Sequence, residues 1–108
     1  MTEPKPRAIV VTPTYDECDN IADLIDAVLA EQPHIPEFEL HVLVSDSHSQ
    51  DGTLEIVQQI AETNPRVHLL DVEMRGIGIG LYKGFVHAIE ELNADVLVEM
   101  DSDFQHNP

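Results

Sequence analysis

Hydrophobic residues are arranged along the chain in short continuous runs that alternate with apolar residues at helical spacing. The first run, Ala8–Val11, is followed by such spacing from Ile21 to Leu29. The second run, Leu40–Val44, is followed by the same spacing from Leu54 to Ala61. A short apolar run is typical of a buried strand, and helical spacing marks one face of an amphipathic helix. The pattern therefore predicts a strand followed by a helix, twice.

Two further segments and a pair of capping signals complete the pattern. The run Val67–Leu70 leads through a glycine-rich turn to apolar residues at helical spacing between Leu81 and Leu92, and Asp95–Met100 is the expected fourth strand. For the second helix, Asp51 is the expected N-cap, and Asn64-Pro65 is the expected stop. The predicted order is βαβαβαβ.

Strands that alternate with helices of this length predict the α/β class. Right-handed crossovers between the strands give a mainly parallel sheet with helices on both faces, which is a three-layer αβα sandwich. With 108 residues, of which 43% are hydrophobic, the chain is expected to form one compact domain. Ligands of open α/β sheets bind at the carboxyl ends of the strands, near a switch in strand order. The loops that follow the four strands are therefore expected to carry the function.

The last of these loops contains two carboxylates, Asp101 and Asp103, directly after the run Val96–Met100. Hard cations take oxygen ligands, and Mg²⁺ is commonly held by one or two carboxylates together with substrate phosphates. Taken alone, the tripeptide is also typical of an acidic surface turn. Its position at the end of a buried strand favours a site for Mg²⁺ or Mn²⁺.

The charge balance limits the partners that the chain can bind. The sequence has 21 Asp and Glu against five Lys and Arg, a formal net charge of −16 at pH 7. Such a surface repels phosphate polymers, so nucleic acid is not an expected partner. The acidic excess is halophile-like, because a salt-rich cytoplasm screens self-repulsion. The only cysteine, Cys18, excludes an internal disulfide, and no apolar run approaches the ~20 residues that span a bilayer, which favours a soluble cytoplasmic protein.

The four loops together resemble the N-terminal half of the inverting family 2 glycosyltransferases of GT-A fold, in particular the polyprenyl-phosphate (dolichyl-phosphate) mannose synthases. Residues 13–17 resemble the family's Pro-Thr-Tyr-Asn-Glu, and residues 46–53 its Asp-Asp-x-Ser-x-Asp-Gly-Thr. Residues 101–108 resemble Asp-Ala-Asp-x-Gln-His-x-Pro, and residues 76–85 loosely follow a glycine-rich family segment. Two departures are Asp16 in place of Asn and Ser47 in place of the second Asp. The resemblance spans nearly the whole chain.

The resemblance implies a nucleotide-sugar site built from all four loops. Residues implied to line the nucleotide pocket, with the last of them at the base, are Pro13, Tyr15, Glu17 and Asp46. Residues implied near the diphosphate or sugar are Arg75, Gly76 and Gly78. For these glycines a tight strand-to-helix turn is the other interpretation. The metal ligands implied by the resemblance are Asp101, Asp103 and Gln105, with the two aspartates as the catalytic residues.

The activity implied by the resemblance is metal-dependent transfer of a sugar, with inversion, onto a polyprenyl phosphate. The favoured donor is GDP-mannose, and the cofactor is Mg²⁺ or Mn²⁺. Family members continue beyond the Asp-x-Asp loop into an acceptor-binding part that often associates with membranes. Residues 1–108 are therefore expected to be the N-terminal nucleotide-sugar-binding part, inactive alone, of an enzyme at the cytosolic face of a membrane, with membrane contact only through the missing parts.

Three alternatives stay open at this point. A different family 2 enzyme would glycosylate a sugar hydroxyl and need a catalytic base. A sugar-1-phosphate nucleotidyltransferase would share the architecture, but its first loop is normally glycine-rich and basic, and residues 13–17 are neither. A non-catalytic nucleotide-binding fragment is the third. Dinucleotide binding is disfavoured, because the glycines at 76, 78 and 80 follow the third strand and lack the required spacing.

Overall fold

The computed structural model describes residues 5–73 and 77–100 of the chain. The order of strands and helices predicted from the hydrophobic pattern is confirmed, and a short 3-10 helix, η1, is added after the first helix. The elements in chain order are β1 (Arg7–Thr14), α1 (Ile21–Leu29), η1 (Gln32–His34), β2 (Glu39–Asp46), α2 (Thr53–Thr63), β3 (Val67–Asp71), α3 (Ile77–Glu90) and β4 (Val96–Glu99).

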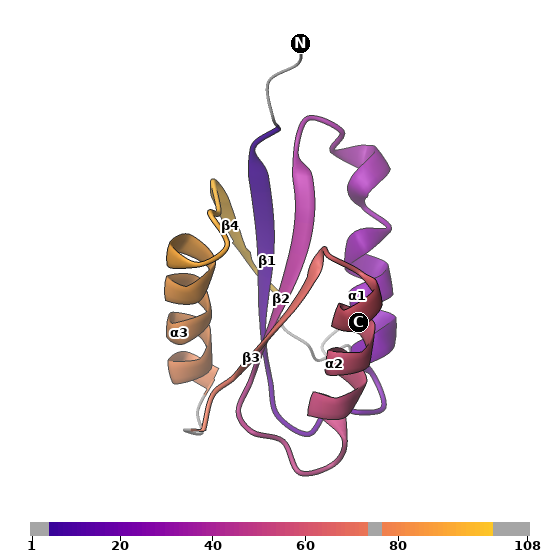
Figure 1. Ribbon diagram of the computed structural model, residues 1–108, viewed down its shortest axis with the longest axis vertical. Helices are drawn as coiled ribbons and strands as arrows, with labels where there is room; N and C mark the ends of the chain where they lie inside the picture. The colour runs from indigo at the N-terminus through magenta and orange to yellow at the C-terminus, as the bar shows by residue number, and fades with distance from the viewer. Residues whose placement is uncertain (1–4, 74–76, 101–108) are drawn as a thin grey trace, which may run out of the picture.

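The four strands form one parallel sheet in the order β3-β2-β1-β4. Helices α1 and α2 cover one face of the sheet, and α3 covers the other (Figure 1). The predicted three-layer αβα arrangement is thus confirmed. The chain builds outward from β1 to β3 and then returns to the opposite side of β1, so the strand order switches between β1 and β4.

The core lies on both faces of the two central strands. In β1 the side chains alternate, so that Ala8 and Val10 pack toward α1 and α2, whereas Ile9 and Val11 pack toward α3. Fully burying a Val, Leu or Ile side chain contributes about 1.5–3 kcal/mol. Since β1 and β2 are buried on both faces, their sequences are continuous apolar runs without polar alternation.

The central strands extend further toward the carboxyl edge than the apolar runs predict. Pro13 lies within β1 and Asp46 is the last residue of β2. A proline is tolerated there because odd-numbered residues of β1 turn their backbone groups toward β4, and the β1–β4 pairing ends at Val11 with Glu99. The missing N–H of Pro13 therefore faces a position where the ladder needs no donor. This extension brings both residues to the edge of the sheet.

The predicted cap of the second helix is shifted by one residue. Gly52, with φ of 102°, is the N-cap of α2, and the helix begins at Thr53. Asp51 still serves the helix start, because its Oδ1 accepts a hydrogen bond of 3.1 Å from the Thr53 N–H. The predicted stop is confirmed, since α2 ends at Thr63 with Asn64 as its C-cap.

The expected glycine-rich turn before α3 is partly wrong, because Gly78 and Gly80 lie inside the helix. At Gly80 a methyl group would lie 3.6 Å from Pro13 Cβ, and at Gly84 one would lie 2.6 Å from Val11 Cγ1. The Ser45 hydroxyl donates a 2.7 Å hydrogen bond to the Gly80 carbonyl. Gly84 therefore lets α3 pack directly on β1, whereas a methyl group at position 80 would meet its neighbours at ordinary contact distances.

We expect Gly84→Ala to lower the free energy of unfolding by about 1–3 kcal/mol, because overpacking a well-filled core forces neighbouring atoms apart. Gly80→Ala is the matched control, since its new methyl group would meet only contacts of 3.6 Å and longer. The control is expected to be neutral or stabilising by up to about 1 kcal/mol through helix propensity. Urea unfolding followed by circular dichroism measures both, and equal losses would contradict the close-packing role of Gly84.

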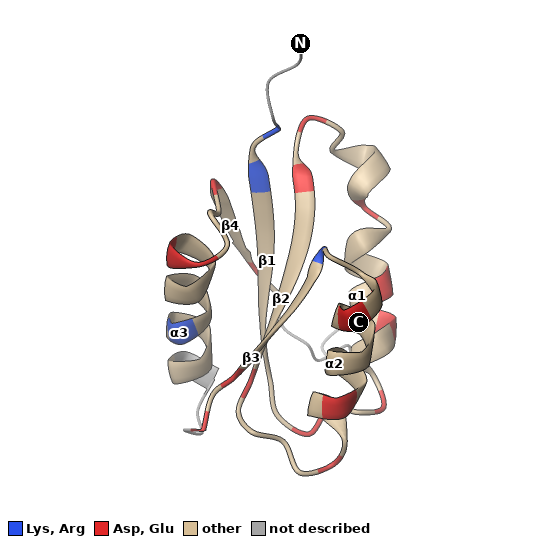
Figure 2. Ribbon diagram, in the orientation of Figure 1, with Lys and Arg blue, Asp and Glu red and all other residues tan. Residues whose placement is uncertain are grey.

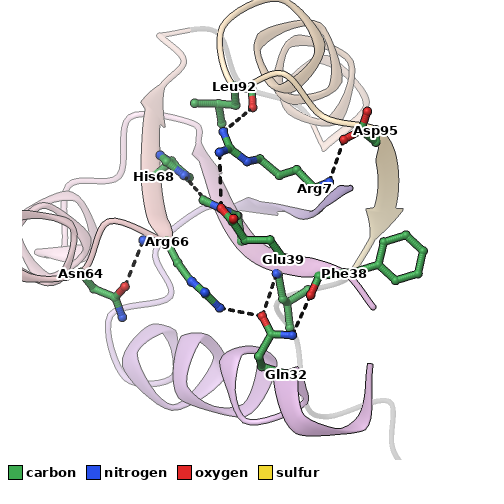
Figure 3. Close-up of polar contacts among 11 residues, drawn as sticks. Arg7, Gln32, Phe38, Glu39, Asn64, Arg66, His68, Leu92 and Asp95 are labelled. Atoms are coloured by element: carbon green, nitrogen blue, oxygen red, sulfur yellow. Dashed lines mark hydrogen bonds and ion pairs between the residues drawn. The ribbon is translucent and has the colours of Figure 1, made fainter. Parts of the chain in front are cut away.

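A polar network closes the amino end of the sheet (Figure 3). The Arg7 guanidinium lies 3.3 Å from Glu39 Oε2 and donates to the Leu92 carbonyl at 2.9 Å. His41 Nε2 lies 2.5 Å from the same Glu39 oxygen, and its Nδ1 lies 2.9 Å from His68 Nε2. Because the carboxylate can only accept, His41 donates from Nε2 and accepts at Nδ1 from His68. Both imidazoles are neutral in this arrangement.

Burial makes protonation of these two histidines unfavourable. It lowers the pKa of His68 to about 4, and the positive charge of Arg7 acts in the same direction, as do those of His41 and His87 when these imidazoles are protonated. Burial also lowers the pKa of His41, against the hydrogen bond to Glu39, which raises it. The folded chain therefore binds fewer protons at these sites than the unfolded chain does below the ordinary histidine pKa of 6.5.

We expect the free energy of unfolding to be largest above the histidine pKa of 6.5 and to decline as the pH falls toward 4, because the unfolded chain takes up the protons. His68→Gln should flatten this dependence. His34→Gln, at an exposed histidine outside the network, should leave it unchanged. Urea titrations from about pH 7 to 4.5 measure the slope; a slope that is the same in both variants would show that the buried pair does not cause it.

Candidate functional site

The carboxyl ends of the strands meet at the lower end of the sheet in Figure 1, where the strand order switches. The loops after β1 and β2 lie side by side there, because the two strands pair along their whole length, from Arg7 with Glu39 to Thr14 with Asp46. β4 reaches the same edge, and the Met100 N–H donates a 3.0 Å hydrogen bond to the Val11 carbonyl. Residue 101 therefore follows directly on a backbone position held against β1.

A buried carboxylate joins the two loops. Asp46 has no exposed surface, and its Oδ1 accepts hydrogen bonds from the Thr14 hydroxyl at 2.5 Å and the Ser49 hydroxyl at 2.7 Å. Its Oδ2 accepts from the Ser49 N–H at 2.7 Å. Burial of a carboxylate is costly unless such donors surround it. Asp46 thus fixes the end of β1 and the loop after β2 relative to each other.

Hydrogen bonds from backbone N–H groups to side chains also join the two loops. The Asp16 N–H donates to the Ser49 hydroxyl at 2.7 Å, and the Gln50 N–H donates to Asp16 Oδ1 at 3.2 Å. Further along, the Glu17 N–H donates to the Thr53 hydroxyl at 3.0 Å. Asp16 has a left-handed φ of 54°, which Asn and Asp adopt more readily than other non-glycine residues. The departure from Asn to Asp at this position therefore preserves the local backbone.

Asp51 and Cys18 make the last link between these loops. Partial burial raises the pKa of the Asp51 carboxyl, but hydrogen bonds from Thr53 and Cys18 outweigh it and lower the pKa to about 2. The Cys18 N–H donates to Asp51 Oδ2 at 3.2 Å. The pKa of the Cys18 thiol is raised to about 11, and the largest cause is the hydrogen bond between the thiol itself and the Asp51 carboxylate. A thiol in this state is a poor nucleophile.

An ion pair lies beside Asp46 at the end of the neighbouring strand. His48, with a left-handed φ of 55°, places its Nδ1 2.9 Å from Asp71 Oδ1. The hydrogen bond to Asp71 raises the pKa of His48, and both side chains are exposed. Asp71 and Asp46 are register partners on β3 and β2, yet one is exposed and the other is buried.

The structure places several of the residues predicted from sequence and leaves others outside the described ranges. Pro13 is buried at the end of β1, and Tyr15 and Glu17 are half-buried in the loop that follows. Gly78 lies in the first turn of α3, which begins at this edge of the sheet. The predicted residues outside residues 5–73 and 77–100 are Arg75, Gly76, Asp101, Asp103 and Gln105.

Sequence reasoning missed the small hydroxyl residues that hold this edge together. Thr14, Ser49 and Thr53 supply the donors and acceptors between the loops, and Ser45 ties β2 to α3. No signal in the single sequence marks these contacts, because serine and threonine are common in turns of every kind. Within the described ranges, no group of three His, Cys, Asp or Glu side chains is arranged to hold a metal ion.

Comparison with known proteins identifies relatives of the whole described region. Residues 9–108 match the model of the family described as "Glycosyl transferase family 2". The chain is 34% identical over 107 residues to polyprenol monophosphomannose synthase of Mycolicibacterium smegmatis, and this covers 97% of the chain and 38% of that protein. It is also 34% identical over 103 residues to undecaprenyl-phosphate mannosyltransferase of Micrococcus luteus, covering 94% of the chain and 40% of that protein.

A solved structure of a mannosyltransferase is also similar to this chain, both in fold and in sequence. The mannosyltransferase PcManGT from Pyrobaculum calidifontis, in complex with GDP-Man and Mn²⁺, has a TM-score of 0.63 and 32% sequence identity to this chain. The match covers 92% of this chain and 28% of that one. The chain therefore spans well under half the length of these relatives.

We expect Asp46→Asn to lower the free energy of unfolding by about 2–3 kcal/mol, because an amide nitrogen would replace one acceptor and face the Ser49 or Thr14 donors. Asp71→Asn removes the same charge from the register partner, which is exposed and paired only at the surface. It should change stability by less than about 0.5–1 kcal/mol. Thermal unfolding of the two variants measures the difference, and equal melting temperatures would contradict the role of Asp46.

Proposed function

The chain belongs to glycosyltransferase family 2, and from this premise we propose that residues 1–108 form the donor-binding part of a metal-dependent glycosyltransferase. The activity of the whole protein is part of the proposal, because the chain covers only 38% and 40% of the two bacterial relatives. The donor is a nucleoside diphosphate sugar, and it lies at the carboxyl edge of the sheet beside the switch between β1 and β4.

The observation that carries this proposal is the edge held by Asp46. Its three hydrogen bonds, with those of Asp16 and Glu17, fix the loops after β1 and β2 next to the point where β4 ends. A ligand site needs such fixed loops, because a positioned pocket avoids the entropy of ordering side chains on binding. Here the fixed loops surround the place where a nucleotide would enter.

Nucleotide binding is assigned to the loop after β1 and to the end of β2. We place the nucleotide against Pro13, Tyr15 and Glu17. Asp46 is assigned to the end of the pocket that holds the base. Because Asp46 is fully buried, it shapes that end by holding Ser49 in position. Arg75 and the glycines Gly76 and Gly78 are assigned to the diphosphate or sugar.

A divalent cation fits the residues that follow β4. The side chains of Asp101, Asp103 and Gln105 offer carboxylate and amide oxygens as ligands, and Mg²⁺ and Mn²⁺ prefer oxygen ligands. These residues lie outside the described ranges, but Met100, directly before them, is held to Val11. When bound there, the cation supplies positive charge that offsets the charge on the departing diphosphate. The complex of PcManGT with GDP-Man and Mn²⁺ supports this assignment.

The acceptor that we propose is a polyprenyl phosphate, and the sugar is mannose from GDP-mannose. The names of the two bacterial relatives support this choice. A phosphate oxygen is already ionised near neutral pH, so attack on the anomeric carbon needs no strong base. Attack from the face opposite the diphosphate inverts the configuration of that carbon. The residues that bind this acceptor belong to the part of the relatives that the chain does not cover.

The proposal also places the full-length protein at the cytosolic face of a membrane. In residues 5–73 and 77–100 no helix is both long and apolar enough to cross a bilayer. Contact with the membrane is therefore assigned to other parts of a longer protein, as the lipid acceptor requires.

We expect the 108-residue chain to bind GDP-mannose only when Mg²⁺ or Mn²⁺ is present. Asp103→Ala should remove this metal dependence together with most of the affinity, because one of two carboxylate ligands is lost. Asp23→Ala is the matched control, since Asp23 is an exposed aspartate of α1, outside the loops to which donor and metal binding are assigned. Calorimetry with Mn²⁺ and with EDTA measures the affinities, and equal affinity in both conditions would refute the metal role.

The same variants in the full-length protein separate the remaining alternatives. Transfer of radiolabelled mannose into an organic-soluble product, lost in Asp103→Ala and kept in Asp23→Ala, is the expected result. Transfer to a soluble sugar hydroxyl would mean that the family assignment holds and that the acceptor is wrong. Formation of a nucleotide-sugar from a sugar phosphate and a nucleoside triphosphate would favour the nucleotidyltransferase alternative. Metal-dependent binding without any transfer would identify a non-catalytic domain.

A further inference from the structure

β3 is an outer strand of the sheet, and among the described residues it pairs only with β2. In a parallel ladder, alternate residues turn their N–H and C=O groups toward the neighbouring strand. The Val72 N–H, just beyond β3, donates to the Asp46 carbonyl at 2.7 Å, so even-numbered residues of this segment face β2. The backbone groups of Leu69 and Asp71 therefore point to the free edge. They offer a partner strand both donors and acceptors.

Open grooves flank this free edge. One, of about 670 Å³, lies between α2 and β3 and reaches across the edge to His87 of α3. The other, of about 480 Å³, lies between the end of β3 and α3. In Figure 1, β3 lies at the front with α3 on one side and α2 on the other. Leu70 and Val86 line the groove on the α3 side, so a strand added here would find depressions on both of its faces.

The charges around the edge select the kind of partner. On α2, Glu55, Gln58 and Glu62 line the larger groove from one stripe of the helix, and both glutamates are exposed. The smaller groove has Lys83 as the only Lys or Arg among its lining residues, against four acidic side chains. Figure 2 shows acidic positions along α2 and at the end of β3. A basic segment would be attracted, whereas a second copy of this chain would bring like charges together.

We propose that the free edge of β3 is a docking site for an extended basic segment of another protein, which adds to the sheet as a further strand. Main-chain hydrogen bonds to Leu69 and Asp71 hold the segment, and its alternate side chains enter the two grooves. Lys or Arg side chains lie on the α2 side next to Glu55 and Glu62. Apolar side chains lie on the α3 side against Leu70 and Val86. None of the residues that line the two grooves is among those assigned to the donor or the metal.

The probe is a capped seven-residue peptide of alternating lysine and valine with a fluorescent label, titrated with the 108-residue chain at fixed salt. Binding is expected to weaken about three- to tenfold in the double variant Glu55→Gln with Glu62→Gln, as loss of two surface charge pairs predicts. The control Asp23→Asn with Asp26→Asn removes the same charge from exposed positions of α1 and should bind like the unchanged chain. Hydrogen exchange should slow at the amides of Leu69 and Asp71.

A second peptide distinguishes strand addition from attraction between opposite charges. It has the same sequence, but alternate backbone nitrogens are methylated, so it keeps its charge and cannot pair along the edge. Loss of binding by this peptide is expected. The proposal is overturned if the methylated peptide binds equally well, if both double variants weaken binding alike, or if protection appears at β4 and not at β3. The donor role is unaffected by these outcomes, since GDP-mannose binding is measured separately.

Discussion

The carboxyl edge of the sheet depends on one buried carboxylate. Asp46 sits at the end of a central strand with no exposed surface, and its charge is tolerated because Thr14 and Ser49 supply three hydrogen bonds. Ser49 also receives the Asp16 N–H through its hydroxyl. Hydrogen bonds that share atoms in this way support one another, and loss of one member leaves a buried group unpaired. The conformations of two loops therefore depend on a single side chain.

The opposite face of the sheet meets the same edge through α3. Gly84 allows the helix backbone to lie against Val11, and Ser45 holds the helix by a hydrogen bond to the Gly80 carbonyl. Helix α3 is thus positioned against the ends of β1 and β2, and Asp46 holds these same strand ends together. At the amino end, buried His41, bonded to half-buried His68 and to Glu39, performs a comparable task. The sheet is fixed at both of its ends by polar groups and between them by apolar packing.

Much of the fold follows from the hydrophobic pattern, because β1 and β2 are buried on both faces and α1 and α2 bury one stripe each. The pattern could not give the bounds of the central strands, since Pro13 and Asp46 are poor strand formers that tertiary pairing retains. It also misplaced the start of α3, because Gly78 and Gly80 lie within the helix despite the low helix propensity of glycine.

The prediction that the four strands end at one edge of the sheet is confirmed, and the candidate site was placed at that edge because ligands of open α/β sheets bind there. Tyr15 and Asp46 were proposed from a family resemblance, whereas the hydrogen bonds of the Thr14, Ser49 and Thr53 hydroxyls between the two loops arise only when residues 32 to 36 positions apart in sequence are brought together. Nothing in a single sequence marks such pairs, since serine and threonine are equally common in turns. The same holds for His41 and His68, which meet across two strands.

The strand order has a consequence for how the protein is made. Contacts between β1 and the region before β4 join residues as far as 88 positions apart, as in the bond from Arg7 to Asp95. During synthesis the first three strands can pair, and their helices can pack on them, while the chain is still emerging. At that stage β1 has no neighbouring strand on its other side. The ribosome must release nearly the whole segment before β4 closes that gap. The nascent segment therefore passes through a stage in which β1 pairs with β2 while its other side, where β4 will add, still exposes unpaired backbone groups.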